Sequence, residues 1–175
     1  MFSDPEKILE QFDLGKGSHV ADFGSGTGFY SFLAAKAVGL GGKVYAVDVQ
    51  KDLLEKLKNE AKNVRHLNNI DIIWADLDHV GGTRLRESSI DAVIVANVFF
   101  QLEKKENTLL EIKRVLKTGA RVLLVDWTDS FGGMGPQPQD VFTEEQAKAL
   151  FLKNGFKEDR TISAGAHHYG IIFRK

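Results

Sequence analysis

Residues 20–30, VADFGSGTGFY, place three glycines within five positions directly after a short apolar run. Glycine after a strand allows positive φ and lets another molecule lie against the backbone. A dinucleotide site requires the spacing G-x-G-x-x-G, and counted from Gly24 the third glycine position is occupied by Phe29. The lysine and hydroxyl residue of a phosphate-binding loop do not follow either. The stretch therefore favours a ligand without a pyrophosphate, and a nicotinamide-dependent oxidoreductase stays an alternative.

The elements that position this loop follow from alternating apolar patterns. β-branched and apolar runs predict strands at 19–23, 43–49, 70–76, 90–98 and 120–127, and amphipathic spacing predicts helices at 3–12, 30–38, 51–64, 103–116 and 143–156. The tail predicts two strands joined around residues 165–168. Strands that alternate with helices form a mostly parallel sheet with helices on both faces, whereas the final pair without a helix must be antiparallel.

The chain is expected to form a single domain over residues 1–175, with few segments left to cover a substrate. These are a short N-terminal helix and lid at 1–14 and a substrate loop at 127–142, where three glycines and two prolines suggest hinges. With 23 basic and 24 acidic residues, no nucleic-acid partner is expected. No cysteine, basic leader or membrane-length apolar run is present, so we expect a cytoplasmic protein without membrane insertion, as a monomer or weak homodimer.

Carboxylates stand at the ends of successive predicted strands. Asp48 ends the second strand in VYAVDV and Asp76 follows the third in IIWADL, while Asp22 precedes the glycine loop. Ligands of an open parallel sheet bind at the carboxyl ends of its strands, so these groups should meet at one edge. Each aspartate alone could be an ordinary helix cap. Together with G-S-G-T-G, they closely resemble the class I S-adenosylmethionine-dependent methyltransferases over nearly the whole chain.

The resemblance implies a Rossmann-like, doubly wound sheet of seven strands, whose last strand is antiparallel and inserted between the fifth and sixth. It implies S-adenosyl-L-methionine as cofactor and S-adenosyl-L-homocysteine as product. The implied cofactor contacts are Gly24, Ser25 and Gly26 for the methionine half, Asp48 with Val49 for the ribose, Asp76 with Leu77 for the adenine, and Asn97 beside the transferred methyl. Asp22 is expected to hydrogen-bond the loop amides and to line the cofactor site.

The acceptor side is inferred from topology and residue type. A terminal hairpin would bring its turn to the carboxyl edge, so His167 and His168 are hypothesised as the general base, with solvated turn histidines as the alternative. Aromatic side chains after strand ends predict a pocket for a flat acceptor. The pocket candidates are Tyr30, Phe99, Phe100 and Trp127.

These features favour an O-methyltransferase acting on a small, aromatic, hydroxyl-bearing molecule. The alternatives are methylation of a nitrogen or of a macromolecular side chain, and a non-catalytic module that binds the cofactor. Metal-dependent O-methyltransferases resemble this chain less, because they place an Asp-Asn pair after the fifth strand. Here the sequence VDWTDS supplies Asp126 and Asp129 instead, and no metal is expected.

Overall fold

The computed structural model describes residues 3–175, so residues 1 and 2 of the expected N-terminal lid lie outside the described residues. Within the described chain no helix is long and apolar enough to cross a bilayer. The elements in chain order are α1 (Pro5–Phe12), β1 (His19–Phe23), α2 (Phe29–Val38), β2 (Lys43–Asp48), α3 (Lys51–Asn63), β3 (Ile70–Trp74), β4 (Ile90–Ala96), η1 (Phe99–Gln101), α4 (Lys105–Val115), β5 (Leu116–Trp127), η2 (Pro138–Asp140), α5 (Glu144–Lys153), β6 (Lys157–Ser163) and β7 (His168–Arg174).

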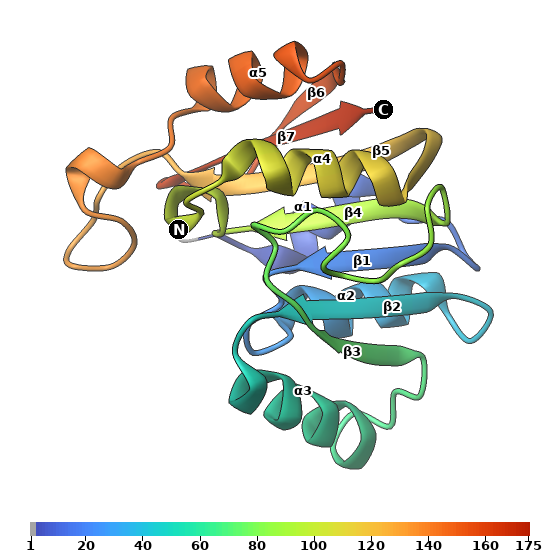
Figure 1. The fold of residues 1–175 in the computed structure, drawn as a ribbon. Helices are drawn as coiled ribbons and strands as arrows, with labels where there is room; N and C mark the ends of the chain where they lie inside the picture. Colours follow the sequence, from blue (N-terminus) through green and yellow to red (C-terminus); the bar gives the residue numbers. More distant parts are fainter. Residues whose placement is uncertain (1–2) are drawn as a thin grey trace.

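The strands form one sheet of seven in the order β3-β2-β1-β4-β5-β7-β6 (Figure 1). The pairs among β1 to β5 are parallel, while β7 pairs antiparallel with both β5 and β6. The predicted fold class is therefore confirmed, including the insertion of the last strand between the fifth and sixth. The point where the order reverses lies between β1 and β4, where ligands of such sheets bind.

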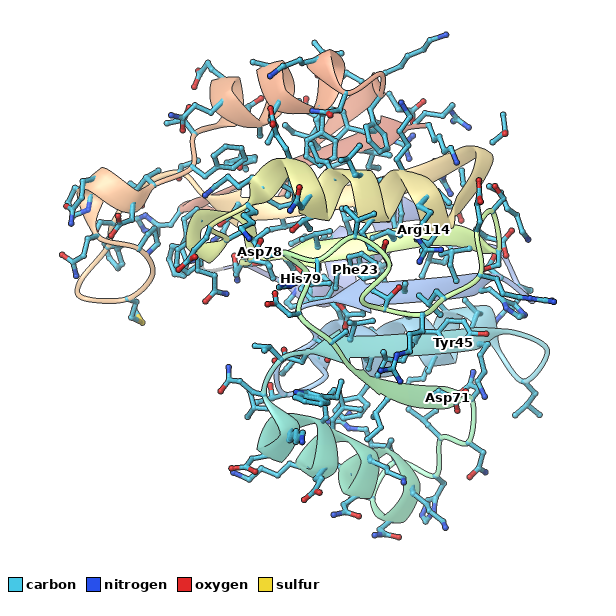
Figure 2. The ribbon with its side chains drawn as sticks, in the orientation of Figure 1. Phe23, Tyr45, Asp71, Asp78, His79 and Arg114 are labelled. Carbon is cyan, nitrogen blue, oxygen red and sulfur yellow. The ribbon has the colours of Figure 1, made fainter. Side chains whose placement is uncertain are left out.

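Helices cover both faces of the sheet (Figure 1). Along β1, as in any strand, successive side chains point to opposite faces of the sheet. Val20 belongs to the apolar cluster formed with α1 and α2, whereas Phe23 packs in the cluster formed with α4 and α5. Figure 2 labels Phe23 on β1, on the side covered by α4. The two apolar clusters pack on the two faces of β1 and β4, the strands between which the order of the sheet reverses.

The ends of some elements differ from those predicted from the sequence. β5 begins at Leu116 rather than at residue 120, and the pairing of β4 with β5 changes register between Ile90 and Ala92. α1 begins at Pro5 with Asp4 as its N-cap, and α5 begins with a capping box in which Thr143 and Gln146 exchange side-chain to backbone hydrogen bonds. The connection between β3 and β4 forms no helix, so residues 75–89 need anchors of another kind.

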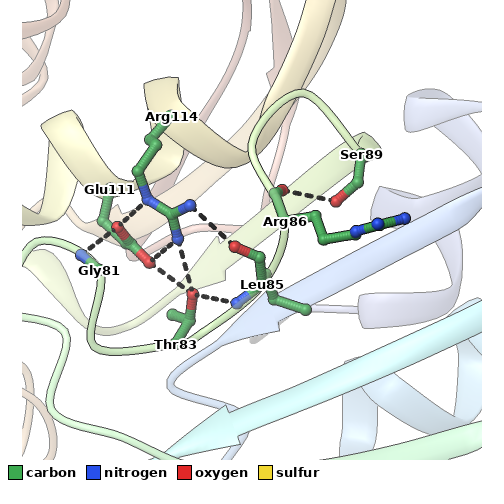
Figure 3. Close-up of polar contacts among 7 residues, drawn as sticks. All are labelled: Gly81, Thr83, Leu85, Arg86, Ser89, Glu111 and Arg114. Carbon is green, nitrogen blue, oxygen red and sulfur yellow. Dashed lines mark hydrogen bonds and ion pairs between the residues drawn. The ribbon is translucent and has the colours of Figure 1, made fainter.

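One anchor of this connection is the buried Glu111 of α4 (Figure 3). Its carboxylate accepts hydrogen bonds from the Gly81 amide at 2.6 Å and from the Thr83 hydroxyl, and it pairs with Arg114 at 2.7 Å. Arg114 also donates to the Leu85 carbonyl at 2.8 Å. Although burial opposes ionisation, these hydrogen bonds hold the pKa of Glu111 below its ordinary value. The cluster fixes the loop that begins with the acidic residues of the ligand edge.

The substitution Glu111→Ala should lower the free energy of unfolding by about 3 kcal/mol, because it leaves Arg114 and two buried donors without their partner. Because the folded pKa is depressed, the stabilisation by Glu111 is present above its unfolded value near 4.5 and is lost on further acidification. Urea unfolding at pH 7 and pH 4 measures both effects.

The matched control is Glu106→Ala on the same helix, whose ion pair with Lys153 is exposed. This change should cost less than about 1 kcal/mol. Equal losses for the two variants would contradict the anchoring role of Glu111.

Candidate functional site

A cavity of about 630 Å³ opens at the carboxyl edge of the sheet, between the ends of β1, β2 and β4 and the start of β7. Its volume lies within the range typical of small-molecule and cofactor sites. Its lining residues come from the α1 region, the glycine loop, the start of α2, the ends of β1, β2, β4 and β5, the segments that follow β2, β3 and β4, η1 and the start of β7. They include Ser3, Pro5, Asp22, Gly24, Ser25, Gly26, Tyr30, Asp48, Val49, Asp76, Leu77, Asp78, Asn97, Gln101, Trp127 and His168.

The glycines of the loop serve different purposes. A Cβ on Gly24 would lie 2.3 Å from the Val98 side chain, and one on Gly28 would lie 2.6 Å from Leu57, so both are required by close packing. A Cβ on Gly26 would meet no atom within 4 Å. Gly26 therefore presents bare backbone to the open cavity, as expected of a loop that cradles a ligand.

Asp48 is fixed in orientation by the loop that it faces. Its carboxylate accepts hydrogen bonds from the Gly26 and Gln50 amides, each at 2.8 Å, and the residue is 7% exposed. A carboxylate offers about four lone-pair directions, and two are used here. The remaining acceptor capacity lies at the cavity, where a cis-diol can supply two donors.

Asp76 follows β3 and is more exposed. Its carboxylate accepts from the Asp78 amide at 2.9 Å and contacts the His79 ring at 3.0 Å. Figure 2 labels Asp78 and His79 on the connection after β3. Leu77 is buried beside it, and the Val49 carbonyl across the cavity accepts from the Trp74 indole at 2.9 Å. An acidic and an apolar group are thus held together at this end of the cavity.

Asp22 makes a different contact from the one expected. Its carboxylate accepts from the Ser31 hydroxyl at 2.6 Å, while the Gly24 and Ser25 amides donate to the Val47 carbonyl instead of to Asp22. The strand geometry accounts for the difference, because the loop amides extend the β1–β2 ladder. Burial raises the pKa of Asp22 to about 7 against the Ser31 hydrogen bond, with a further contribution from Asp48.

The antiparallel hairpin brings Trp127 and His168 together at the opposite end of the cavity. The two residues are register partners of β5 and β7, and their ring centroids lie 4.2 Å apart. His168 is 7% exposed, and neither of its ring nitrogens has a hydrogen-bond partner. Burial lowers the pKa of His168, and the neighbouring His167 adds to this effect. A neutral imidazole therefore faces the cavity.

His167 points to a different environment. Its Nδ1 pairs with the Asp129 carboxylate at 2.9 Å, and its ring stacks on Phe131 with centroids 3.9 Å apart. His167 is not among the residues that line the cavity. His167 lies in the turn before β7, whereas His168 is the first residue of that strand, and the two side chains separate at this boundary.

Two expected pocket residues lie in the core or against it. Phe99 is fully buried and stacks on Phe142 at 5.6 Å between centroids, and Phe100 packs against the same apolar cluster. Neither lines the cavity, because η1 directs Phe99 toward α5. Tyr30 and Trp127 line the cavity.

The acidic residues at and just beyond the end of β5, Asp126 and Asp129, are held by other groups of the protein. Asp126 is fully buried and accepts from the Phe100 and Trp127 amides, and burial raises its pKa to about 6 against these hydrogen bonds. Asp129 pairs with His167. Within residues 3–175, no group of three or more histidine, aspartate or glutamate side chains is arranged to hold a metal ion.

The buried polar atoms without partners gather in this cavity. Across the described part of the chain, five buried side-chain nitrogen or oxygen atoms have no hydrogen-bond partner. They belong to four residues, Ser25, Tyr30, Asn97 and His168, and all four line the cavity. Buried polar groups are normally hydrogen-bonded, so this concentration indicates groups that await a polar ligand.

Sequence reasoning missed several lining residues. Ser3 and Pro5 enter the cavity because α1 packs against α2, and Gln101 enters through η1. Asp78 could have been found from the spacing ADLDH after a strand, but the short α1 and η1 segments gave no such signal.

The chain belongs to the methyltransferase domain family, whose profile matches residues 14–163. A solved structure of an S-adenosylmethionine-dependent methyltransferase from Aquifex aeolicus shares 30% identity with a TM-score of 0.89, covering 99% of this chain and 90% of that one. The fold, the family model and this neighbour show that the chain belongs to the S-adenosylmethionine-dependent methyltransferases. The bare backbone at Gly26 and the oriented Asp48 carboxylate fit that cofactor.

Curated relatives are similar over part of the chain. A ubiquinone/menaquinone biosynthesis C-methyltransferase from Haemophilus ducreyi is 27% identical over 65% of this chain and 42% of its own length. A probable cobalt-precorrin-6B C(15)-methyltransferase from Sulfurisphaera tokodaii is 33% identical over 66% of this chain and 57% of its own length. The chain thus spans about half the length of these relatives.

S-adenosylmethionine should bind more tightly as the pH rises from 6 to 7.5, by about eightfold if binding requires the ionised form of Asp22. The carboxyl of Asp22 loses its proton near pH 7 and then attracts the ammonium and sulfonium charges of the ligand. Calorimetric titration across this range measures the effect. The variant Asp22→Asn, which still accepts from Ser31, should lose this pH dependence; an equally steep dependence in the variant would assign it to another group.

Proposed function

We propose that the protein transfers the methyl group of S-adenosylmethionine to the hydroxyl oxygen of a small aromatic acceptor. The observation that carries this proposal is His168, a buried imidazole whose two nitrogens have no protein partner and which lies against Trp127 in the cavity. A flat acceptor stacked near these rings would place its hydroxyl within reach of the imidazole.

His168 serves as the general base in this proposal. Its lowered pKa leaves the ring neutral at pH 7, with one nitrogen free to accept a proton. When bound, the cofactor supplies an electrophilic methyl group on a sulfonium. As the carbon–oxygen bond forms and the carbon–sulfur bond breaks, the proton of the acceptor hydroxyl passes to His168. His167 is not assigned this role, because its ring is held by Asp129 outside the cavity.

The half of the cavity next to the glycine loop, called the donor half, is assigned to the cofactor. We place the methionine part against Gly24, Ser25 and Gly26. The backbone at Gly26 is open to the cavity, and the Ser25 hydroxyl has no partner.

The nucleoside is assigned to the strand ends beyond this loop. The ribose diol is placed at Asp48 beside Val49, and the adenine at Asp76 beside Leu77. Asn97, whose side-chain oxygen is buried without a partner at the end of β4, is placed beside the methyl group.

Residues 1–175 are proposed to act as one methyltransferase domain in which two short segments cover the acceptor. Ser3 and Pro5 of the segment 1–14 line the cavity. The loop 127–142 folds back so that Gly135 lies on the Trp127 ring, where a Cβ would approach to 2.6 Å. Both segments are therefore proposed to cover the acceptor end of the cavity, near Trp127, and to exclude water during methyl transfer.

A second candidate is transfer to a ring carbon next to the acceptor hydroxyl. Both curated relatives described above are named C-methyltransferases, which favours this outcome. The same deprotonation by His168 would activate a ring carbon, since a phenolate is nucleophilic at oxygen and at the adjacent carbons. Fragmentation of the product by mass spectrometry separates a methyl ether from a ring methyl group.

The direct test measures transfer of radiolabelled methyl groups from S-adenosylmethionine to a panel of phenols. His168→Gln should lower kcat by about 10²-fold or more, as expected for loss of a general base, and should remove the acidic limb of the pH–rate profile. Its affinity for S-adenosylhomocysteine should stay within about twofold of the original, because His168 lies away from the donor half.

The matched control is His167→Gln, which should keep its pH–rate profile and most of its activity. Unchanged turnover in His168→Gln would remove the base assignment. Absence of transfer to every phenol would overturn the proposed acceptor class.

A further inference from the structure

The cavity is lined by acidic groups. Four carboxylates, Asp22, Asp48, Asp76 and Asp78, belong to its lining, and within residues 3–175 no lysine or arginine does. In a partly desolvated site, unpaired charges interact more strongly than in water. The charged side chains of the cavity therefore favour cationic groups such as a sulfonium, and they supply no cation to pair with an anionic acceptor.

Carboxylates also act on the acceptor end of the cavity, which is lined by Tyr30 and His168. Burial raises the pKa of Tyr30, and the negative charges of Asp4, the N-cap of α1, and of Asp22 on β1 both add to this effect. Lys7 pairs with Asp4 at 3.5 Å, but both side chains are substantially exposed, so the pair is weak. Burial lowers the pKa of His168, and the charge of Asp129, beyond the end of β5, opposes this larger effect, while the Asp129 carboxylate itself pairs with His167. Carboxylates thus approach the two acceptor-side groups from three elements.

The polar groups that await a partner at this end are neutral. Tyr30 keeps its hydroxyl proton because burial raises its pKa. Asn97 offers an amide oxygen, and His168 offers a neutral ring that is more than nine-tenths buried. These side chains can hold hydroxyl or carbonyl groups of an acceptor, but none of them neutralises a carboxylate or a phosphate.

We infer that the acceptor is electrically neutral in the part that enters the cavity, and that the site rejects aromatic acceptors carrying a carboxylate, phosphate or sulfate. An anion placed in the cavity would lose hydration next to Asp22, and no lysine or arginine of the lining would pair with it. The selection rests on the proposed function, since it concerns the acceptor of that same methyl transfer.

The test uses pairs of phenols that differ mainly in charge, such as methyl 3,4-dihydroxybenzoate and 3,4-dihydroxybenzoate. Binding to the protein loaded with S-adenosylhomocysteine is followed by quenching of tryptophan fluorescence, since Trp127 lines the cavity. Methyl transfer is measured in parallel. The ester should bind and react at least about 100-fold better, in Kd and in kcat/KM, than the carboxylate.

Gln101→Lys places a cation at the exposed rim of the cavity. Because this cation favours the carboxylate, the preference for the ester over the carboxylate should fall by about tenfold or more. Gln101→Met is the matched control of similar length without charge, and it should keep the preference. A narrowing of equal size in both variants would show that charge is not the cause.

The two hypotheses fail in different ways. A carboxylate that binds and reacts as well as its ester would overturn the charge selection and leave the proposed methyl transfer standing. Preferential binding of the ester without methylation of any pair would overturn the proposed function and leave the charge selection standing. Failure of every pair to bind would overturn both.

Discussion

The Asp48 carboxylate joins the two halves of the donor site. By accepting from the Gly26 and Gln50 amides, each at 2.8 Å, it ties the glycine loop after β1 to the end of β2. These are charge-assisted hydrogen bonds in a buried position, which makes them strong and directional. The same contact leaves acceptor capacity facing the cavity, so loop geometry and ligand recognition depend on one side chain.

The other half of the cavity is built by the end of the chain. β7 runs antiparallel beside β5, and this topology pairs Trp127 with His168 across 41 positions of sequence. A parallel last strand would have carried its first residue to the far edge of the sheet. The donor contacts come from β1 and β2, whereas the acceptor groups come from β5 and β7. One sheet edge can therefore keep a common donor site while the acceptor end differs.

The sequence predicts most of this fold because apolar periodicity and glycine punctuation agree at nearly every element. The switch from βα units to a final antiparallel hairpin is visible in the tail, whereas the place of β7 between β5 and β6 followed from the family resemblance and is confirmed by the sheet order. What the pattern could not resolve is the direction of individual side chains after a strand ends. Phe99 turns into the core through η1, and His167 turns to Asp129, although each is next in sequence to a residue that lines the cavity.

The partner of Asp22 escaped prediction for a related reason. The loop amides prolong the ladder to β2, a choice set by register, and Ser31 on α2 takes their place. Roles assigned to residues around the cofactor stay predictions, since they concern contacts with a bound molecule. The clustering of unpartnered atoms on Ser25, Tyr30, Asn97 and His168 emerges only in three dimensions, because these residues are spread over most of the chain.

Calorimetric titration with S-adenosylhomocysteine tests the central role of Asp48 most directly. The original protein should bind one equivalent, and Asp48→Asn should lose about tenfold or more in affinity, as expected for a buried charged hydrogen-bond acceptor. Asp52→Asn, on the exposed first turn of α3, should bind as the original does. Thermal unfolding confirms that each variant is folded. Undiminished affinity in folded Asp48→Asn would contradict the account.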